Sequence, residues 1–320
     1  MSTAQGVSES RSRLVRSFLA GARAVVVWVG VGTFGVWAVG QLARDATFVT
    51  GLCFYLPSVL VVGVLAVVAV TLAVAHRRRS ALLLALLGVP PLAFVGVVEN
   101  DFVPKPAGPP GEYRLMHWNV KGRPVRPGVG EYLLAENTDL YVLTDMAGPA
   151  HVEVFRDQLG PGYTAETFGE LAVVGRGRVE VGEELAHRGE FVVRAVTWTP
   201  ADRPISLLVV DLPSDIWVAR DPLLREVNDW IDRRRPDLVV GDFNAPRRSW
   251  ALSNLPTGYR HAYHTAGDGW GATWRVRTPM YTIDQCIHGP RVRPVRYRLG
   301  GLGGQSDHLY QVFDFGLEDR

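Results

Sequence analysis

The sequence predicts an α/β domain that follows three membrane-spanning helices. Two features of the 320-residue chain indicate this division. Three long segments in the first hundred residues lack charged side chains, whereas the rest of the chain alternates between strand-like and helix-like segments. The charge balance changes at the same place. Residues 1–99 contain eight basic and three acidic residues, and residues 100–320 contain 26 basic and 29 acidic residues.

The uncharged segments cover about residues 24–43, 48–75 and 80–98, and each is long enough to cross the hydrocarbon core of a bilayer. The third contains Pro90 and Pro91, which kink or end helices, so a re-entrant segment is the alternative there. The first segment is too long for the core of a signal peptide, and two more segments follow it. We therefore expect a permanent anchor over residues 1–99.

Arginine residues predict the orientation of this anchor. They are concentrated in the N-terminus and in the loop 76–79, which the positive-inside rule places in the cytoplasm. Three crossings then place residues 100–320 on the opposite, extracytoplasmic side. Residues 100–111 contain four prolines and are expected to form a stiff linker to a domain over residues 112–320.

Ten segments of the domain have the period of a strand or a helix. We expect strands over 113–120, 140–143, 171–175, 191–199, 206–212, 238–241, 281–288 and 310–315, and helices over 130–136 and 221–234. The second helix is expected to begin with Asp221 as its N-cap and Pro222 as its first residue. Cys53 lies in a predicted span and Cys286 in a strand, so we expect no disulfide and a buried Cys286 thiol.

The strongest motif is Gly241-Asp242-Phe243-Asn244, directly after the strand 238–241. Side chains two residues apart on an extended chain point the same way, so Asp242 and Asn244 can together activate a water and hold a phosphate oxygen. The alternative is an ordinary turn, because Gly, Asp and Asn all favour turns.

Three further features place polar side chains in or next to predicted strands. Ser306-Asp307-His308 follows a glycine-rich loop, and its Asp and His can serve as a metal ligand and a general acid or base. Asp284 is set into an apolar strand, where a lone charge is costly unless it is paired. Asn119 ends the first strand.

Together and in this order, these motifs resemble the endonuclease/exonuclease/phosphatase superfamily over about residues 112–316. Two smaller features agree, namely residues 169–176, with Gly175 where the family usually has Ser, and Thr273-Trp274. The resemblance implies a four-layer α/β/β/α sandwich of the DNase I type, with the site at one mouth. It also implies a divalent cation, usually Mg²⁺, with Mn²⁺ as the other candidate.

The resemblance also implies roles for individual residues. Asn119 and Asp145 would hold the metal, and Asp307 would either reach the metal or orient His308. Asp242 would orient the attacking water, Asn244 would bind the phosphate, His308 would contact phosphoryl oxygens, and Asp284 would orient a catalytic side chain.

Two positions depart from the family pattern. Asp145 stands where the family has Glu, and Asp211 stands where the family has a His that meets the phosphate. Asp211 is therefore a candidate catalytic residue that either adds a metal ligand or repels phosphate. His117 can replace the lost donor, with a packing residue as the alternative, and Arg220 and Arg247 are candidate phosphate contacts.

These inferences predict a membrane-anchored, extracytoplasmic, metal-dependent phosphohydrolase that acts on a phosphate ester or pyrophosphate. A tether beside the bilayer favours a lipid-linked substrate. The layout is also similar to that of teicoplanin-resistance membrane proteins. The alternatives are an exported nuclease, which the acidic domain disfavours because nucleic acid attracts basic surfaces, and an envelope protein that retains the fold without activity.

Overall fold

A computed structural model describes residues 2–106, 109–301 and 304–318 of the chain. Residues 107–108 of the predicted linker and residues 302–303 of the glycine-rich loop lie outside the described residues. The chain forms two compact units. One comprises Met1–Arg44 and Val49–Glu99, and the other comprises Asp45–Phe48 and Asn100–Arg320.

The first unit is built from helices joined by short turns. Its helices are α1 (Ser2–Ala43), α2 (Phe48–Phe54, of which Phe48 belongs to the second unit), α3 (Ser58–Val74), α4 (Arg78–Phe94) and a π-helical turn, η1 (Val95–Glu99). The stretches Ala20–Ala43 and Arg78–Glu99 are long and apolar enough to cross a membrane.

The span expected over residues 48–75 is not one straight helix. It is broken between α2 and α3, which meet at an angle of 64°. Pro57 precedes α3, and proline has no amide hydrogen to continue the helical ladder. The described residues therefore offer two candidate spans, or three if the bent pair counts as one. Pro90 and Pro91 lie inside α4 and do not end it.

Close helix packing in this unit depends on a small residue. A Cβ atom on Gly40 would lie 2.4 Å from the carbonyl carbon of Cys53, so glycine is needed where these backbones meet. Trp37 Nε1 donates a hydrogen bond to Ser58 Oγ (2.9 Å), which in turn donates to Glu99 Oε1 (2.6 Å). This chain of bonds links α1, α3 and the π-helical turn.

The second unit contains two six-stranded sheets. The first has the order β11-β12-β1-β2-β4-β3 and the second the order β5-β6-β7-β8-β10-β9. The strands of the first sheet are β1 (Tyr113–Asn119), β2 (Leu140–Thr144), β3 (Tyr163–Phe168), β4 (Leu171–Arg176), β11 (Val292–Gly300) and β12 (Tyr310–Leu317). Those of the second are β5 (Arg178–Arg188), β6 (Phe191–Thr199), β7 (Ile205–Asp211), β8 (Leu238–Asp242), β9 (Arg260–His261) and β10 (Asp284–His288).

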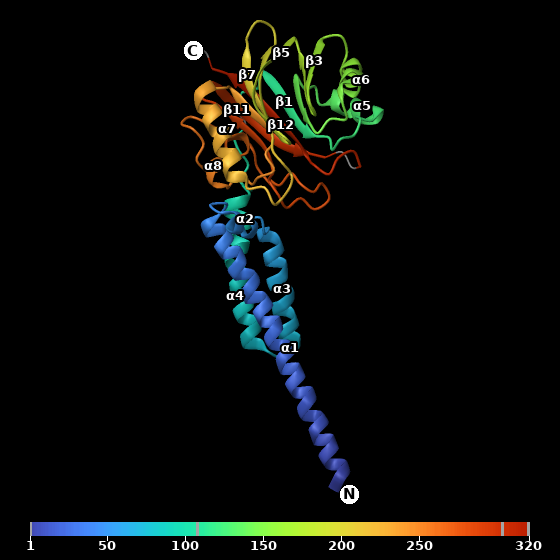
Figure 1. Cartoon of the computed structure of the whole chain (residues 1–320), viewed down its shortest axis with the longest axis vertical. Helices are drawn as coiled ribbons and strands as arrows, with labels where there is room; N and C mark the ends of the chain where they lie inside the picture. Colours follow the sequence, from blue (N-terminus) through green and yellow to red (C-terminus); the bar gives the residue numbers. More distant parts are fainter. Residues whose placement is uncertain (1, 107–108, 302–303, 319–320) are drawn as a thin grey trace. The chain divides into compact units, whose positions relative to one another are not determined.

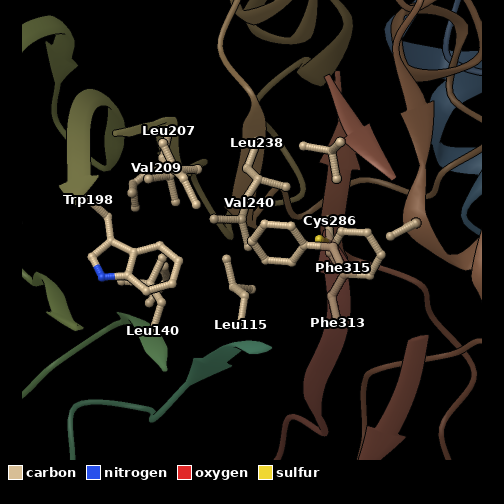
Figure 2. Packing of buried hydrophobic residues seen from close by; sticks show 14 of the residues in the cluster. Leu115, Leu140, Trp198, Leu207, Val209, Leu238, Val240, Cys286, Phe313 and Phe315 are labelled. Carbon is tan, nitrogen blue, oxygen red and sulfur yellow. The ribbon is translucent and has the colours of Figure 1, made fainter. Parts of the chain in front are cut away.

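The two sheets pack face to face over an apolar core. Figure 2 shows Leu115 and Leu140 of the first sheet opposite Val209 and Val240 of the second, with Trp198 beside them. Cys286 is buried in the same core, as expected. Alternate residues of each strand supply this layer, because successive side chains point to opposite faces of a sheet.

Helices cover the outer face of each sheet (Figure 1). α5 (Pro127–Ala135) and α6 (Pro149–Leu159) cover the first sheet, and α7 (Arg220–Arg234) and α8 (Trp250–Ser253) cover the second. The short α9 (Ala262–Ala266) packs beside β11. The expected two-sheet α/β architecture is confirmed.

Two details of the sequence prediction are wrong. Ala219 precedes α7 and Arg220 begins it, so Asp221 and Pro222 are its second and third residues rather than its N-cap and first residue. The charge of Asp221 in the first turn still complements the helix dipole. The strand expected from residue 281 begins at Asp284, because Tyr281 instead pairs with Trp274 in an isolated bridge.

Candidate active site

Polar residues replace apolar ones at one end of the core between the sheets. They continue the core-facing rows of their strands, because side chains two residues apart share a face. Asn119 continues the row of Leu115 on β1, Asp211 that of Val209 on β7, and Asp242 that of Val240 on β8. The strand ends therefore bring these side chains to the same mouth of the sandwich.

Three carboxylates lie in register across the second sheet. Asp211 pairs with Asp242 in the parallel ladder of β7 and β8, and Asp242 pairs with Asp284 in the antiparallel ladder of β8 and β10. Neighbouring strands are about 4.8 Å apart, so the three side chains form a row of like charges on one face. Such a row is destabilising unless its members are protonated, paired or bound to a cation.

Two side chains from the first sheet and its loops reach across to this row. His308 Nδ1 lies 3.0 Å from Asp284 Oδ2 and 3.9 Å from Asp242 Oδ2. Asn119 Nδ2 donates a hydrogen bond to Asp242 Oδ2 at 2.9 Å. In the part of the chain that the structure describes, Asp242, Asp284 and His308 are the only acidic, His or Cys residues that form a group of three with ligand atoms within 4.8 Å of one another.

The Gly241-Asp242-Phe243-Asn244 motif has a separate physical reason at each position. A Cβ atom on Gly241 would lie 1.8 Å from the Val210 carbonyl oxygen, so only glycine fits there. Phe243 is fully buried in the core beneath α7. Asn244 has φ of +45°, donates its backbone N–H to Asp242 Oδ1 (2.9 Å) and donates Nδ2 to the Leu212 carbonyl (2.8 Å). The Asn244 backbone N–H thus holds one carboxylate oxygen of Asp242, and Asn119 holds the other.

The Ser306-Asp307-His308 motif is held by its serine. Ser306 Oγ donates to the Asn119 carbonyl (2.7 Å) and accepts from the His308 backbone N–H (3.0 Å). Asp307 does not orient His308. Its carboxylate accepts bonds from Lys121 Nζ (2.5 Å) and Trp274 Nε1 (3.3 Å), and Asp284 occupies the orienting position on the His308 ring.

Burial and mutual charge set the protonation of the row. Burial and the charge of Asp284 raise the pKa of Asp242 to about 7. Burial and the charge of Asp242 raise the pKa of Asp211 well above its usual range. Burial would lower the pKa of His308, but Asp284 outweighs it and raises that pKa to about 9. Burial would likewise raise the pKa of Asp284, but the facing His308 lowers it. A protonated His308 beside an ionised Asp284 is thus the state near neutral pH.

Asp145 lies at the rim of this cluster, outside the group of three. It follows β2 with φ of +54°, and its carbonyl accepts a bond from the Gly122 backbone N–H (2.5 Å). Burial raises the pKa of its half-buried carboxyl, which is close enough to His308, Asp307 and Lys121 to feel their charges.

The residues present fit a divalent cation. Five carboxylates face one mouth, from Asp145, Asp211, Asp242, Asp284 and Asp307, and the nearby cations are Lys121 and His308. Carboxylate and amide oxygens are the ligands that Mg²⁺ takes in proteins. An excess of buried negative charge is what such an ion relieves.

Of the three expected substrate contacts, His117 lies beneath the row, with Nδ1 3.9 Å from Asp284 Oδ1, and the two arginines bond elsewhere. His117 is fully buried, with Nδ1 2.8 Å from Gln311 Nε2 and Nε2 3.4 Å from Thr144 Oγ1, and burial lowers its pKa to about 4. A direct phosphate contact by His117 stays a prediction. Arg220 donates to the Val218 carbonyl (2.6 Å), and Arg247 lies 3.7 Å from the Tyr263 ring centroid. Both arginines are buried, so a phosphate contact by either stays a prediction.

Sequence reasoning missed Lys121 and Trp274 as site residues. Lys121 lies two residues after Asn119, and its backbone N–H donates to Asn119 Oδ1 at 2.9 Å. One signal was available in the sequence. The chain has only two lysines, and Lys121 follows the end of the strand that carries Asn119, where the family pattern gathers several carboxylates.

The comparisons with known proteins agree with this geometry. The sequence model of the endonuclease/exonuclease/phosphatase family matches residues 116–308, which include every candidate site residue. A search of curated protein sequences found no match.

Solved structures with a similar fold include TDP2 of D. rerio with a single-strand DNA product (20% identity, TM-score 0.50, 63% of this chain and 98% of that chain). Another is a mannosyl-6-phosphatase of Bacteroides thetaiotaomicron VPI-5482 (11%, 0.50, 64% and 99%). A third is a functionally unknown conserved protein of Enterococcus faecalis V583 (14%, 0.51, 64% and 100%). At these identities the likeness shows the fold alone.

Proposed function

Because the chain belongs to the endonuclease/exonuclease/phosphatase family, we propose that it is a membrane-anchored, metal-dependent hydrolase of a phosphate ester or pyrophosphate. The observation that carries this proposal is the in-register row of Asp211, Asp242 and Asp284 with His308 set against it. A buried row of acids costs stability, so its presence at the mouth favours a chemical role.

A divalent cation, Mg²⁺ or Mn²⁺, would be held by Asn119 and Asp145, with Asp307 as a further ligand. When bound, it supplies a Lewis acid for the charge that develops on the phosphoryl group. The excess of carboxylates over nearby cations supports a bound cation, and this ligand set is the one that the family pattern implies.

The remaining roles belong to side chains of the cluster. Asp242 takes the proton of the attacking water, because a carboxylate with a pKa near the working pH suits a general base. His308 is held protonated by Asp284, so its Nε2–H donates to a phosphoryl oxygen. Asn244 positions Asp242 through its backbone N–H.

We further propose a lipid-linked substrate and an extracytoplasmic domain. The long apolar helices support anchoring, and an anchor raises the encounter rate with substrates in the same bilayer. The arginine-rich loop 76–79 supports a cytoplasmic location of that loop and, after one more crossing, an external location of the domain.

The test is metal-dependent hydrolysis by the full-length protein in detergent or nanodiscs, followed as phosphate released from the pyrophosphate, p-nitrophenol released from the diester, or shortening of the DNA. A polyprenyl pyrophosphate, bis(p-nitrophenyl) phosphate and single-stranded DNA are compared with Mg²⁺, Mn²⁺ or EDTA. Asp242→Asn and His308→Ala should each lower turnover at least about 100-fold, or about 3 kcal/mol of barrier. The exposed His187→Ala is the matched control. Near-normal turnover in either site variant would overturn the assignment.

A second experiment addresses the two departures from the family pattern. Asp145→Glu combined with Asp211→His restores the usual residues. If the native site is active with its own ligand set, the double variant loses native activity. If the double variant gains activity that the natural chain lacks, the natural chain is an inactive envelope protein.

A further inference from the structure

We propose that the loop 213–219 seats the domain on the bilayer surface beside the catalytic cluster. The loop joins β7 to α7, and three consecutive apolar residues in it are exposed. Ile216 is 63% exposed, Trp217 69% and Val218 37%. The proposal rests on the membrane anchoring contained in the proposed function.

Hydrogen bonds hold the backbone of this loop. Trp217 N–H donates to Asp215 Oδ1 (2.9 Å), and Ser214 N–H donates to Glu190 Oε2 (3.0 Å). The buried Arg220 donates to the Val218 carbonyl (2.6 Å). These bonds fix the backbone of the loop, while the side chains of Ile216 and Trp217 stay exposed.

Trp217 identifies the bilayer as the surface that covers this loop. Its ring stacks on Phe48 with ring centroids 6.0 Å apart. Phe48 belongs to the short segment Asp45–Phe48 of the same compact unit, which follows directly after the apolar stretch Ala20–Ala43. A residue just beyond the end of a span lies at the level of the lipid headgroups, where Trp is enriched.

The same loop is bonded to the catalytic cluster. Leu212, which precedes it, donates its N–H to the Asp242 carbonyl (2.9 Å) and accepts a bond from Asn244 Nδ2 (2.8 Å). Asp211 is the residue before Leu212. A loop seated at headgroup level would therefore present the cluster to a phosphate at that level. The substrate class is an amphiphile whose phosphate or pyrophosphate lies at the water interface.

The test measures the depth of the loop in vesicles of phosphatidylcholine and phosphatidylglycerol that contain the full-length protein. A spin label is placed by Ile216→Cys in a Cys53→Ala background, since the buried Cys286 is shielded from the reagent. The matched control is Val154→Cys on α6, which is similarly apolar and 55% exposed. Collisional broadening by oxygen and by a water-soluble nickel chelate is compared at both sites.

We expect the Ile216 label to collide more with oxygen than with nickel, and the Val154 label to show the reverse. Equal access of nickel to both labels would overturn the proposal, because the loop would then lie in water. Shielding of the Ile216 label from both reagents would also overturn it, because a protein would then cover the loop.

An activity measurement supplements the depth measurement. Ile216→Ser combined with Trp217→Ser should lower turnover of a polyprenyl pyrophosphate in vesicles about tenfold or more. Turnover of soluble bis(p-nitrophenyl) phosphate should stay unchanged, and Val154→Ser should change neither. Equal loss on both substrates would contradict the proposal. The label depths need no turnover, so they decide the position of the loop even if the proposed activity fails.

Discussion

Replacing Asp284 with asparagine should lower the pKa of His308 from about 9 to about its ordinary 6.5 or below. The facing carboxylate, 3.0 Å from His308 Nδ1, is what outweighs the effect of burial. The difference between 9 and 6.5 corresponds to about 3 kcal/mol of interaction, at about 1.4 kcal/mol per pH unit. His308 is only 7% exposed, so solvent screens this interaction little.

The raised pKa of His308 also makes the free energy of unfolding depend on pH. A histidine whose folded pKa exceeds its unfolded value binds its proton more tightly in the folded protein. Its contribution to the free energy of unfolding is complete below about pH 6.5 and is lost as the pH rises through about 9. The Asp284→Asn variant should lack this loss between pH 6.5 and 9.

The assay is the pH dependence of deuterium exchange at the C2 position of His308, followed by mass spectrometry on full-length protein treated with EDTA. Asp157→Asn, an exposed change on α6, is the control and should leave the His308 profile unchanged. The basic limb of the pH–rate profile should move in the same direction as the exchange profile. A His308 pKa that stays at 8 or above in Asp284→Asn would refute the reasoning.

Three other predictions concern the metal, the lysine and the topology. Millimolar Mg²⁺ or Mn²⁺ should raise the melting temperature, because a cation at 100 times its dissociation constant adds about 2.7 kcal/mol to the free energy of unfolding. Asp145→Ala should reduce this rise, and no shift in differential scanning fluorimetry would count against a metal site. Lys121→Met should lower kcat/KM about tenfold and change the free energy of unfolding by less than about 1 kcal/mol, because its ion pair with Asp307 is half exposed. Unchanged kinetics would remove Lys121 from the site. Alkaline phosphatase fused after residue 320 should be active, whereas a silent fusion with an active cytoplasmic reporter would reverse the predicted orientation.

Local patterns were sufficient for much of the domain. The period-two row of β6 identifies a strand, because a strand that buries one face must alternate. Several other elements escaped prediction, among them β5, whose exposed acidic side chains hide the alternation, and the short α9. The π-helical turn at Val95–Glu99 also has no local signature.

These local patterns could not predict contacts between segments that are far apart in the sequence. Asn119 and Asp242 are 123 positions apart in sequence, and Asp284 and His308 are 24 apart. Their meeting depends on how one sheet lies over the other, which side-chain packing decides. Gly175 is an example, since a Cβ atom there would lie 2.9 Å from the Trp198 ring, which takes up the room that the family's usual serine would need.

The sequence by itself determined the division into an apolar helical part and an alternating α/β part, because this follows from hydrophobic period. The two-sheet fold and the residues expected at one mouth followed from the resemblance of its motifs to a known family. Only the tertiary structure decided that Asp284 rather than Asp307 holds His308, and that Asp211 joins a row of three acids. It also decided that the middle apolar segment bends near Pro57. The physical reason is strand register. Register is set by the packing of whole sheets, and a shift of one residue would turn each of these carboxylates to the opposite face.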